Sequence, residues 1–311
     1  MELIRPNTNF DFMRLRRISV AISLALLVIA LVAFFGRGLN LALDFTGGSM
    51  VELSFEKPVQ HDDLVTQLEK AGMKGAVVQA LGTETKQMVR LRADHNEKDA
   101  AVSLRVLNAV QTPQNPVKVE RSDSVGPQVG AEIVENGVIA LLFVALGFLI
   151  YISLRFEWKF AIAAIMTTLH DVMVVAGIFA LFQIEFDVVV FAGILSVMGY
   201  SINDTIVVFD RVRENFRAMH KATPMEVLNR SVNETLSRTI ITSFVALLTV
   251  LALYFFGGDS LKGMALSQIL GIVIGTLSSI FFACPLLLWL GLSKQDLVKT
   301  VEEDAALAAI P

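Results

Sequence analysis

Six long runs of apolar residues divide the sequence, and they constrain its fold more than any other feature. Each run is about as long as the roughly 20 residues that a helix needs to cross the hydrocarbon core of a bilayer. The composition agrees, because 54% of the 311 residues are hydrophobic and only 18% are charged. We therefore predict a polytopic α-helical membrane protein with six transmembrane helices, at residues 18–36, 134–154, 160–182, 188–209, 239–256 and 264–290.

Basic residues flank these runs on alternate sides and predict the orientation of the chain. Loops rich in Lys and Arg face the cytoplasm. The basic residues in question are Arg5, Arg14, Arg16 and Arg17, then Arg155 and Lys159, then Arg211, Arg213, Arg217, Lys221 and Arg230. The intervening loops at 183–187 and 257–263 carry none and one. Both the N-terminal arm (1–17) and the tail (293–311) are thus expected in the cytoplasm, and the segment 37–130 in the periplasm of a bacterium.

The segment 37–130 has the pattern of a small α+β domain. Alternating apolar residues predict strands, helical spacing predicts helices, and a polar stretch predicts a hairpin turn. The strands are expected at 49–55, 76–81, 88–92 and 117–120, the helices at 61–71 and 98–110, and the turn at 82–86. This β-α-β-β-α-β order is that of a ferredoxin-like domain. Its nearly equal numbers of acidic and basic residues argue against a nucleic-acid partner.

Two glycine-containing motifs flank this domain. Asp44, Gly47 and Gly48 lie at its start, and Gly126 and Pro127 lie at its end. The first motif has two interpretations, a cradle for phosphate or a tight bend. Because no Gly-Lys-Ser follows, we favour the bend and treat both motifs as structural.

The fourth apolar run contains an acid. Asp204 lies among Ser201, Asn203 and Thr205, and a carboxylate in hydrocarbon costs at least a few kcal/mol, so it must face protein or water. Ser201, Asp204 and Thr205 are three and four residues apart, which places them on one face of a helix. A buried acid that only holds helices together is the alternative, but intramembrane acids usually mark a functional site.

The third run contains adjacent polar residues, His170 and Asp171. They relay protons, or they form a structural pair whose hydrogen bonds are satisfied, and the sequence does not decide between the two. A metal site needs three or more protein ligands, and the chain has four His and one Cys, Cys284. We therefore predict neither a metal nor a cofactor.

The fifth run begins with a polar stripe of Thr235, Arg238, Thr239 and Thr242. Arg238 is the natural partner for Asp204, because both lie in the same half of the bilayer and an opposite charge offsets the cost of the acid. The alternative is an arginine that extends along the helix to reach the membrane interface.

These motifs together resemble a known family. The segments that carry the resemblance are 43–48, 125–127, 155–158, 170–171 and, most specific, 199–215. They are similar, in the same order, to motifs of the SecD/SecF family of protein-export membrane proteins, within the resistance-nodulation-division superfamily. The resemblance covers residues 43–290.

The resemblance implies a subunit of the bacterial inner membrane that is not an enzyme and that uses the proton-motive force to assist preprotein translocation. Its implied partners are SecD, the SecYEG translocon with YajC, preproteins in transit and membrane lipid. Asp204 and Arg238 fall on the intramembrane acid and arginine of the family's proton path, with Ser201, Asn203 and Thr205 beside them. A second acid of that path belongs to SecD.

Two other functions stay open. An intramembrane serine protease would use Ser201 with His170, provided that the two helices bring them within hydrogen-bond reach. A proton-coupled exporter of a lipid or small molecule would share the buried acid.

Overall fold

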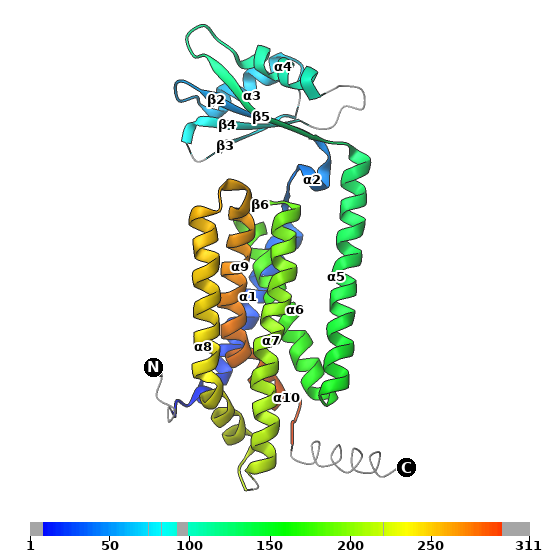
Figure 1. The fold of residues 1–311 in the computed structure, drawn as a ribbon, viewed down its shortest axis with the longest axis vertical. Helices are drawn as coiled ribbons and strands as arrows, with labels where there is room; N and C mark the ends of the chain where they lie inside the picture. The colour runs from blue at the N-terminus through cyan, green and yellow to red at the C-terminus, as the bar shows by residue number, and fades with distance from the viewer. Residues whose placement is uncertain (1–8, 74, 82, 92–98, 220, 294–311) are drawn as a thin grey trace. The chain divides into compact units, whose positions relative to one another are not determined.

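The computed structural model describes residues 9–73, 75–81, 83–91, 99–219 and 221–293. Most of the predicted C-terminal tail and the first eight residues of the predicted arm lie outside these ranges. The chain forms two compact units, a helical bundle (Met1–Asn40 and Ala140–Pro311) and an α+β domain (Leu41–Ile139). Both are drawn in Figure 1.

The α+β domain contains one four-stranded antiparallel sheet with two longer helices. Its elements are α2 (Leu43–Thr46), β2 (Gly48–Phe55), α3 (His61–Lys70), β3 (Val77–Leu81), β4 (Thr83–Leu91), α4 (Asp99–Val110) and β5 (Val117–Val125). The strands lie in the order β3-β4-β2-β5, and all neighbouring pairs are antiparallel. This is the arrangement of a ferredoxin-like domain, as the element order predicts.

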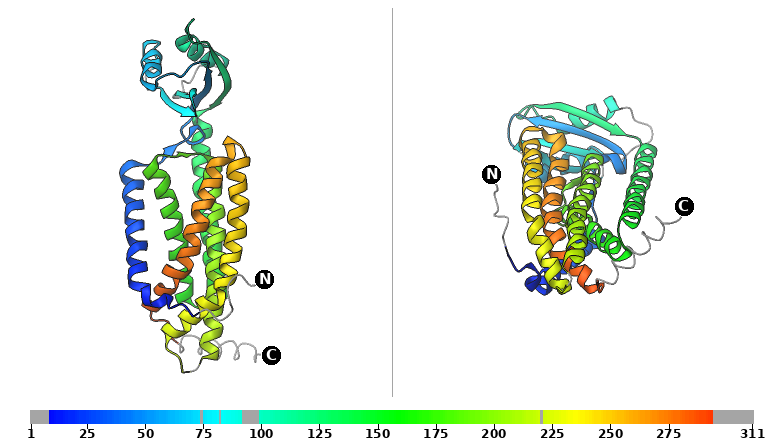
Figure 2. Two further views of the ribbon diagram at one scale, coloured as in Figure 1. Left: turned by 90° about the vertical axis from the view of Figure 1, so that its left-hand side faces the viewer. Right: turned by 60° about the horizontal axis from the view of Figure 1, so that its bottom comes forward.

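The core of this domain follows from the alternation of β2. Val51, Leu53 and Phe55 are buried, because every second side chain of a strand points to the same face. Leu64 of α3 and Val106 of α4 belong to the same core. The two helices cover one face of the sheet, as a turned view shows (Figure 2).

The predicted turn at 82–86 is wrong in extent. Strand β4 already begins at Thr83, which pairs with Leu81 of β3. Threonine is favoured in strands, and the segment that follows Thr83 continues the ladder. Lys86 pairs across to Ser54 of β2. Gly82, the first residue of the predicted turn, lies outside the described residues.

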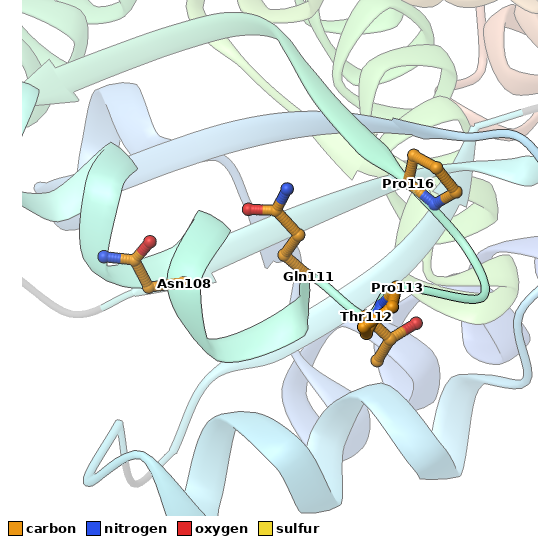
Figure 3. Close-up of a pocket in the computed structure, with 5 residues that line it drawn as sticks. All are labelled: Asn108, Gln111, Thr112, Pro113 and Pro116. Atoms are coloured by element: carbon orange, nitrogen blue, oxygen red, sulfur yellow. The ribbon is translucent and has the colours of Figure 1, made fainter.

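A hollow of about 350 Å³ lies between the end of α4 and the start of β5 (Figure 3). Asn108, Gln111, Thr112, Pro113 and Pro116 line it. None of these side chains is charged, and we assign the hollow no role.

The helical bundle contains long apolar helices that lie side by side (Figures 1 and 2). Its elements are η1 (Phe12–Leu15), α1 (Arg16–Arg37), β1 (Asn40–Leu41), α6 (Trp158–Phe182), β6 (Glu185–Phe186), α7 (Val188–Ala218), α8 (Pro224–Phe256), α9 (Asp259–Ser278), the π-helical segment η2 (Ser279–Ala283) and α10 (Cys284–Trp289). Helix α5 (Pro127–Arg155) connects the two units. With α5, six helical stretches of the described chain are long and apolar enough to cross a membrane, which confirms the predicted fold class.

Two helices extend well beyond their apolar runs. Helix α7 continues to Ala218 and α8 begins at Pro224, so most of the charged residues between the fourth and fifth runs extend these helices. A capping box starts α8, since the Thr223 hydroxyl accepts from the Glu226 amide while the Glu226 carboxylate accepts from the Thr223 amide.

Helix α9 packs closely on α7 because it carries glycine at the contact. A Cβ atom at Gly271 would lie 2.1 Å from Cγ2 of Val197, and one at Gly275 would lie 3.3 Å from Cβ of Ser201. Small residues allow helix backbones to approach closely in membranes. This close approach brings the polar residues of α7 and α9 into contact.

Candidate functional site

Asp204 lies inside the bundle, where three helical segments meet. Its side chain points inward from α7, and the residue is only 7% exposed. The Thr239 hydroxyl of α8 donates to Oδ1 at 2.8 Å, and the Ser279 hydroxyl of η2 donates to Oδ2 at 2.6 Å. Each carboxylate oxygen therefore has a hydroxyl donor.

The serine that contacts Asp204, Ser279, is the first residue of the π-helical segment η2. Ser278 ends α9 and Ser279 begins η2, and the wider π turn changes the direction of the side chains that follow. Single π turns inside α-helices are frequent at functional sites. Here two consecutive serines reach two different carboxylates.

A second polar layer lies one helical turn from Asp204. The Tyr200 hydroxyl donates to the Ser243 hydroxyl at 2.8 Å, and Ser243 bonds the Thr276 hydroxyl at 2.7 Å. Each residue of this layer lies three or four positions from a residue of the Asp204 site. The pairs are Tyr200 with Asp204, Ser243 with Thr239, and Thr276 with Ser279. Tyr200 also borders a pocket of about 280 Å³ between α7, α8 and α9, which includes Gln268. Polar groups thus extend from this pocket toward Asp204.

Asp171 is a second buried carboxylate, with no exposed surface. Its Oδ1 lies 2.9 Å from Nδ1 of His170, the preceding residue on α6. Its Oδ2 accepts from the hydroxyls of Ser201 at 2.5 Å and Ser278 at 2.7 Å. The His170 ring is stacked on Phe282, with 4.6 Å between centroids.

The predicted pair of Arg238 with Asp204 is not formed among the described residues. Arg238 is exposed on α8, while its neighbour Thr239 is buried and contacts the acid. Adjacent helical residues point about 100° apart, so Arg238 does not share the face of α8 that presents Thr239, although its charge still acts on Asp204 from a distance. The buried stripe of α8 is Thr235, Thr239 and Ser243, and Thr242 is exposed.

The other predicted residues of the fourth run separate. Asn203 is exposed, and Thr205 is buried with a hydroxyl that has no hydrogen-bond partner within the described chain. Ser201 bonds Asp171, so the structure joins the two polar groups that the sequence treats separately. In a serine protease the histidine contacts the serine directly. Here Ser201 and His170 each contact Asp171, which lies between them, so the arrangement does not suit a protease.

The two glycine motifs meet within the α+β domain. Gly47 and Gly48 have φ of 64° and 128°, conformations that favour glycine. A Cβ atom at Gly130 of α5 would lie 3.1 Å from both Gly47 N and the Phe45 carbonyl oxygen. Asp44 lies in the short helix α2, and Gly126 immediately precedes Pro127, the first residue of α5. A close backbone contact therefore joins the start of α5 to the segment around Gly47.

Sequence reasoning named Ser201 and Thr239 but missed the other two hydroxyl donors, Ser278 and Ser279. Ser278 and Ser279 lie in an apolar run, where single serines are common, and nothing in the spacing announces a π turn. Tyr200, Ser243 and Thr276 were recoverable in part, since Tyr200 and Ser243 stand at helical intervals from Asp204 and Thr239. Within the described ranges, no group of three or more His, Cys, Asp or Glu residues is placed to hold a metal ion.

These helices and the polar site inside them define the chain as a polytopic membrane protein with buried acids at its centre. Two family patterns match it, "Protein export membrane protein SecD/SecF, C-terminal" over residues 105–293 and "SecD/SecF GG Motif" over residues 32–59. The chain belongs to the SecD/SecF family.

Relatives named protein translocase subunit SecF support the same assignment. One from Pseudomonas aeruginosa is 43% identical over 298 residues, which cover 95% of this chain and 96% of the relative. One from Escherichia coli O157:H7 is 41% identical over 302 residues, covering 96% and 93%. The chain is a multi-pass protein of the bacterial inner membrane.

A solved structure shares the fold. It is SecDF, described as a translocon-associated membrane protein, from Thermus thermophilus, with a TM-score of 0.83 and 37% identity. The match covers 93% of this chain and 40% of that chain. A second SecDF structure, in a form called super-membrane-facing, gives a TM-score of 0.67 and 35% identity over 100% of this chain and 41% of the other. The chain therefore spans about two fifths of the solved proteins.

Proposed function

We propose that this chain is a subunit of a SecD–SecF complex that uses the proton-motive force to assist preprotein translocation through the SecYEG channel. The observation that carries the proposal is Asp204, a titratable carboxylate held by hydroxyl groups inside a membrane-spanning bundle. The names of the relatives supply the export pathway, and we assign the chain no enzymatic activity.

The partners of Asp204 suit a group that gains and loses a proton. A hydroxyl donates or accepts, because its proton rotates about the C–O bond. Thr239 and Ser279 therefore stabilise the ionised carboxylate as donors, and they also accept from a protonated carboxyl. An arginine at the same distance donates only, and would favour the ionised form alone.

We propose that Arg238 has its partner in SecD instead of pairing directly with Asp204. It is exposed on α8, in the turn that presents Thr239 to the acid. An exposed cation near a membrane interior needs an anionic or polar partner. We propose that this face of α8 meets SecD, whose acid completes the proton path, because the solved SecDF chains contain more than this chain.

The orientation follows from the basic loops. We propose that both termini are cytoplasmic and that the α+β domain is periplasmic, so that proton flow through the bundle moves a domain on the exporting side. Association with SecYEG and YajC rests on the family resemblance.

The test is export from membranes that contain or lack this chain. We expect the full chain to co-purify with SecD, and vesicles containing both to show preprotein translocation that an uncoupler reduces. Vesicles lacking the chain should lose that uncoupler-sensitive part. Uncoupler-insensitive export, or stable purification of the chain without SecD, would contradict the proposal; labelling of Ser201 by a serine-directed probe would indicate a protease instead.

A further inference from the structure

The contacts of both His170 ring nitrogens bear on how many protons the His170–Asp171 pair holds. Nε2 lies 3.3 Å from the Ser23 carbonyl oxygen of α1, and Nδ1 lies 2.9 Å from Asp171 Oδ1. A carbonyl oxygen only accepts, so this contact is a hydrogen bond when Nε2 carries the hydrogen. Stacking on Phe282 orients the ring plane and keeps the two nitrogens on their separate partners.

The contact between Nδ1 and Oδ1 then requires a further proton. With Nε2 protonated, a neutral imidazole would present the Nδ1 lone pair to an ionised carboxylate, and the two would repel. The observed 2.9 Å contact is satisfied when one proton lies on either Nδ1 or Oδ1. In both cases the pair carries no net charge, which suits complete burial.

We propose that His170 and Asp171 form a second proton-binding site of the bundle, distinct from Asp204. Loss of the shared proton leaves one proton for the two contacts of the imidazole, so either the bond to Asp171 or the bond to the Ser23 carbonyl is lost and the ring shifts. Because Nε2 holds the Ser23 carbonyl, that movement changes the contact between α1 and α6. The site adds to the proposed function. The role of its proton in export rests on that function, whereas the protonation of the pair does not.

The surroundings of the pair contain few other charges. From α7 it meets Ser201, with Asp204 one turn further along, and from α9 it meets Ser278. From α1 it meets the uncharged Ser23 backbone. Among the described residues of these elements, His170 is the titratable group that contacts Asp171 directly. The next one along its hydrogen-bonded partners is Asp204, one turn from Ser201 on α7.

A cavity gives His170 a separate opening. It has a volume of about 300 Å³ and lies between α1, α6 and α9. Its lining is largely apolar, but Ser19, Ser23, His170 and Ser278 contribute to it. Water takes about 30 Å³ in the liquid, so the cavity leaves room beside His170 on the α1 side, away from the Asp204 pocket.

The two acids share the elements that hold them. Ser201 and Asp204 are one turn apart on α7, and Ser278 and Ser279 are consecutive at the junction of α9 and η2. Ser201 and Ser278 bond Asp171, while Ser279 bonds Asp204. A shift of the α7–η2 contact at one acid therefore changes the hydrogen bonds at the other.

The protonation of the pair is measured without reference to export. In the full chain with SecD in lipid, nitrogen NMR of labelled histidine identifies His170 by the signal that His170→Gln removes. We expect either two protonated nitrogens, or Nε2 alone protonated together with a carboxylic-acid infrared band that Asp171→Asn removes. A neutral imidazole beside an ionised Asp171 at neutral pH would overturn the proposal.

The role of this proton is tested by comparing Asp171→Asn with Asp204→Asn in the export assay. We expect Asp171→Asn to assemble and to lose most uncoupler-sensitive export, whereas Thr168→Val should retain it, because the buried Thr168 hydroxyl bonds the Ala164 carbonyl of its own helix. Full activity of Asp171→Asn beside an inactive Asp204→Asn would refute this site and leave the proposed function standing. Full activity of both would refute the proposed function, and the NMR result would then decide the protonation of the pair. If Asp171→Asn fails to assemble, His170→Gln replaces it with the same expectation.

Discussion

At the scale of single residues, hydroxyl groups stabilise both buried acids of the bundle. Thr239 and Ser279 hold Asp204, while Ser201 and Ser278 hold Asp171 together with His170. Each of these hydroxyls belongs to a different helical segment from the acid that it contacts. Small changes in helix packing therefore alter the environment of the acids directly.

Removing one donor to Asp204 should weaken proton coupling without abolishing it. A hydrogen bond to a charged group contributes about 1.5–3 kcal/mol. We expect Thr239→Val or Ser279→Ala to reduce uncoupler-sensitive export, and the double variant to reduce it further. Thr242→Val is the matched control, because the exposed Thr242 hydroxyl bonds the Arg238 carbonyl of its own helix. Equal loss in the control would show that the effect is not specific to the Asp204 contact.

The acids were predictable from sequence, but most of their partners were not. An acid inside an apolar run is conspicuous, and so is His170 beside Asp171. Arg238 was assigned by charge complementarity, and the prediction of a direct pair failed because the rotation of α8 decides which of two adjacent residues faces inward. Ser278 and Ser279 lie at the junction of α9 and the π-helical segment η2, and the sequence carries no signal of that junction.

At the scale of elements, the contact between α7 and α9 positions both sites. Gly271 and Gly275 allow α9 to approach Val197 and Ser201. The serines of the α9–η2 junction follow within the next turns, so their distance from α7 depends on this contact.

A methyl group at Gly271 should force the two helices apart. Its Cβ would lie 2.1 Å from Val197 Cγ2, and such overpacking costs about 1–3 kcal/mol. We expect Gly271→Ala to lower the thermal stability of the purified complex and its uncoupler-sensitive export. Gly199→Ala on α7 is the control, since no atom of the described chain beyond its own helix would lie within 4 Å of a Cβ there, and alanine favours the helix. A Gly271→Ala protein as stable as the Gly199→Ala protein would contradict the packing argument.

Element types were easier to predict than element ends. Apolar runs mark the part of a helix that crosses the bilayer, but α7 and α8 continue into charged sequence, where the capping box at Thr223 and Glu226 marks the true start of α8. Strand β4 begins at Thr83 because its ladder with β2 and β3 outweighs the local turn pattern.

An ion pair on the sheet gives the α+β domain a small dependence on pH. The Lys86 ammonium donates to Glu120 at 2.8 Å and holds the pKa of that carboxyl below its usual value of 4.5. A depressed pKa contributes stability that is present above the ordinary value and lost as pH falls through the lower one. We expect Lys86→Met to reduce the urea midpoint of the full chain's α+β domain slightly at pH 7 and not in strong acid. An equal reduction at both pH values would indicate lost packing instead.

At the scale of the whole molecule, the sequence predicted six membrane helices and a small α+β domain because both depend on periodicity and length. The orientation of the chain in the membrane is not contained in the fold, and it rests on the basic loops alone. The contribution of SecD comes only from the family resemblance, since half of the proposed proton path lies in another chain.

Labelling of single cysteines tests the orientation. Cys284 is buried and is the one cysteine of the sequence, so Cys284→Ala gives a clean background. In intact spheroplasts we expect Gln60→Cys, at the exposed N-cap position of α3, to react with an impermeant maleimide. We expect Lys221→Cys, between α7 and α8, to react only after the membrane is opened. The reverse pattern would place the α+β domain in the cytoplasm.

The central claim is that Asp204 carries the transported proton, and Asp204→Asn tests it most directly. Asparagine keeps the volume of the side chain and its capacity for hydrogen bonds with Thr239 and Ser279, but it does not titrate. Export is measured in vesicles that contain equal amounts of assembled complex, with and without a proton-motive force. We predict that the Asp204→Asn complex loses the stimulation by the proton-motive force, while Asp204→Glu retains part of it. An Asp204→Asn complex that assembles normally and responds fully to the proton-motive force would contradict the account.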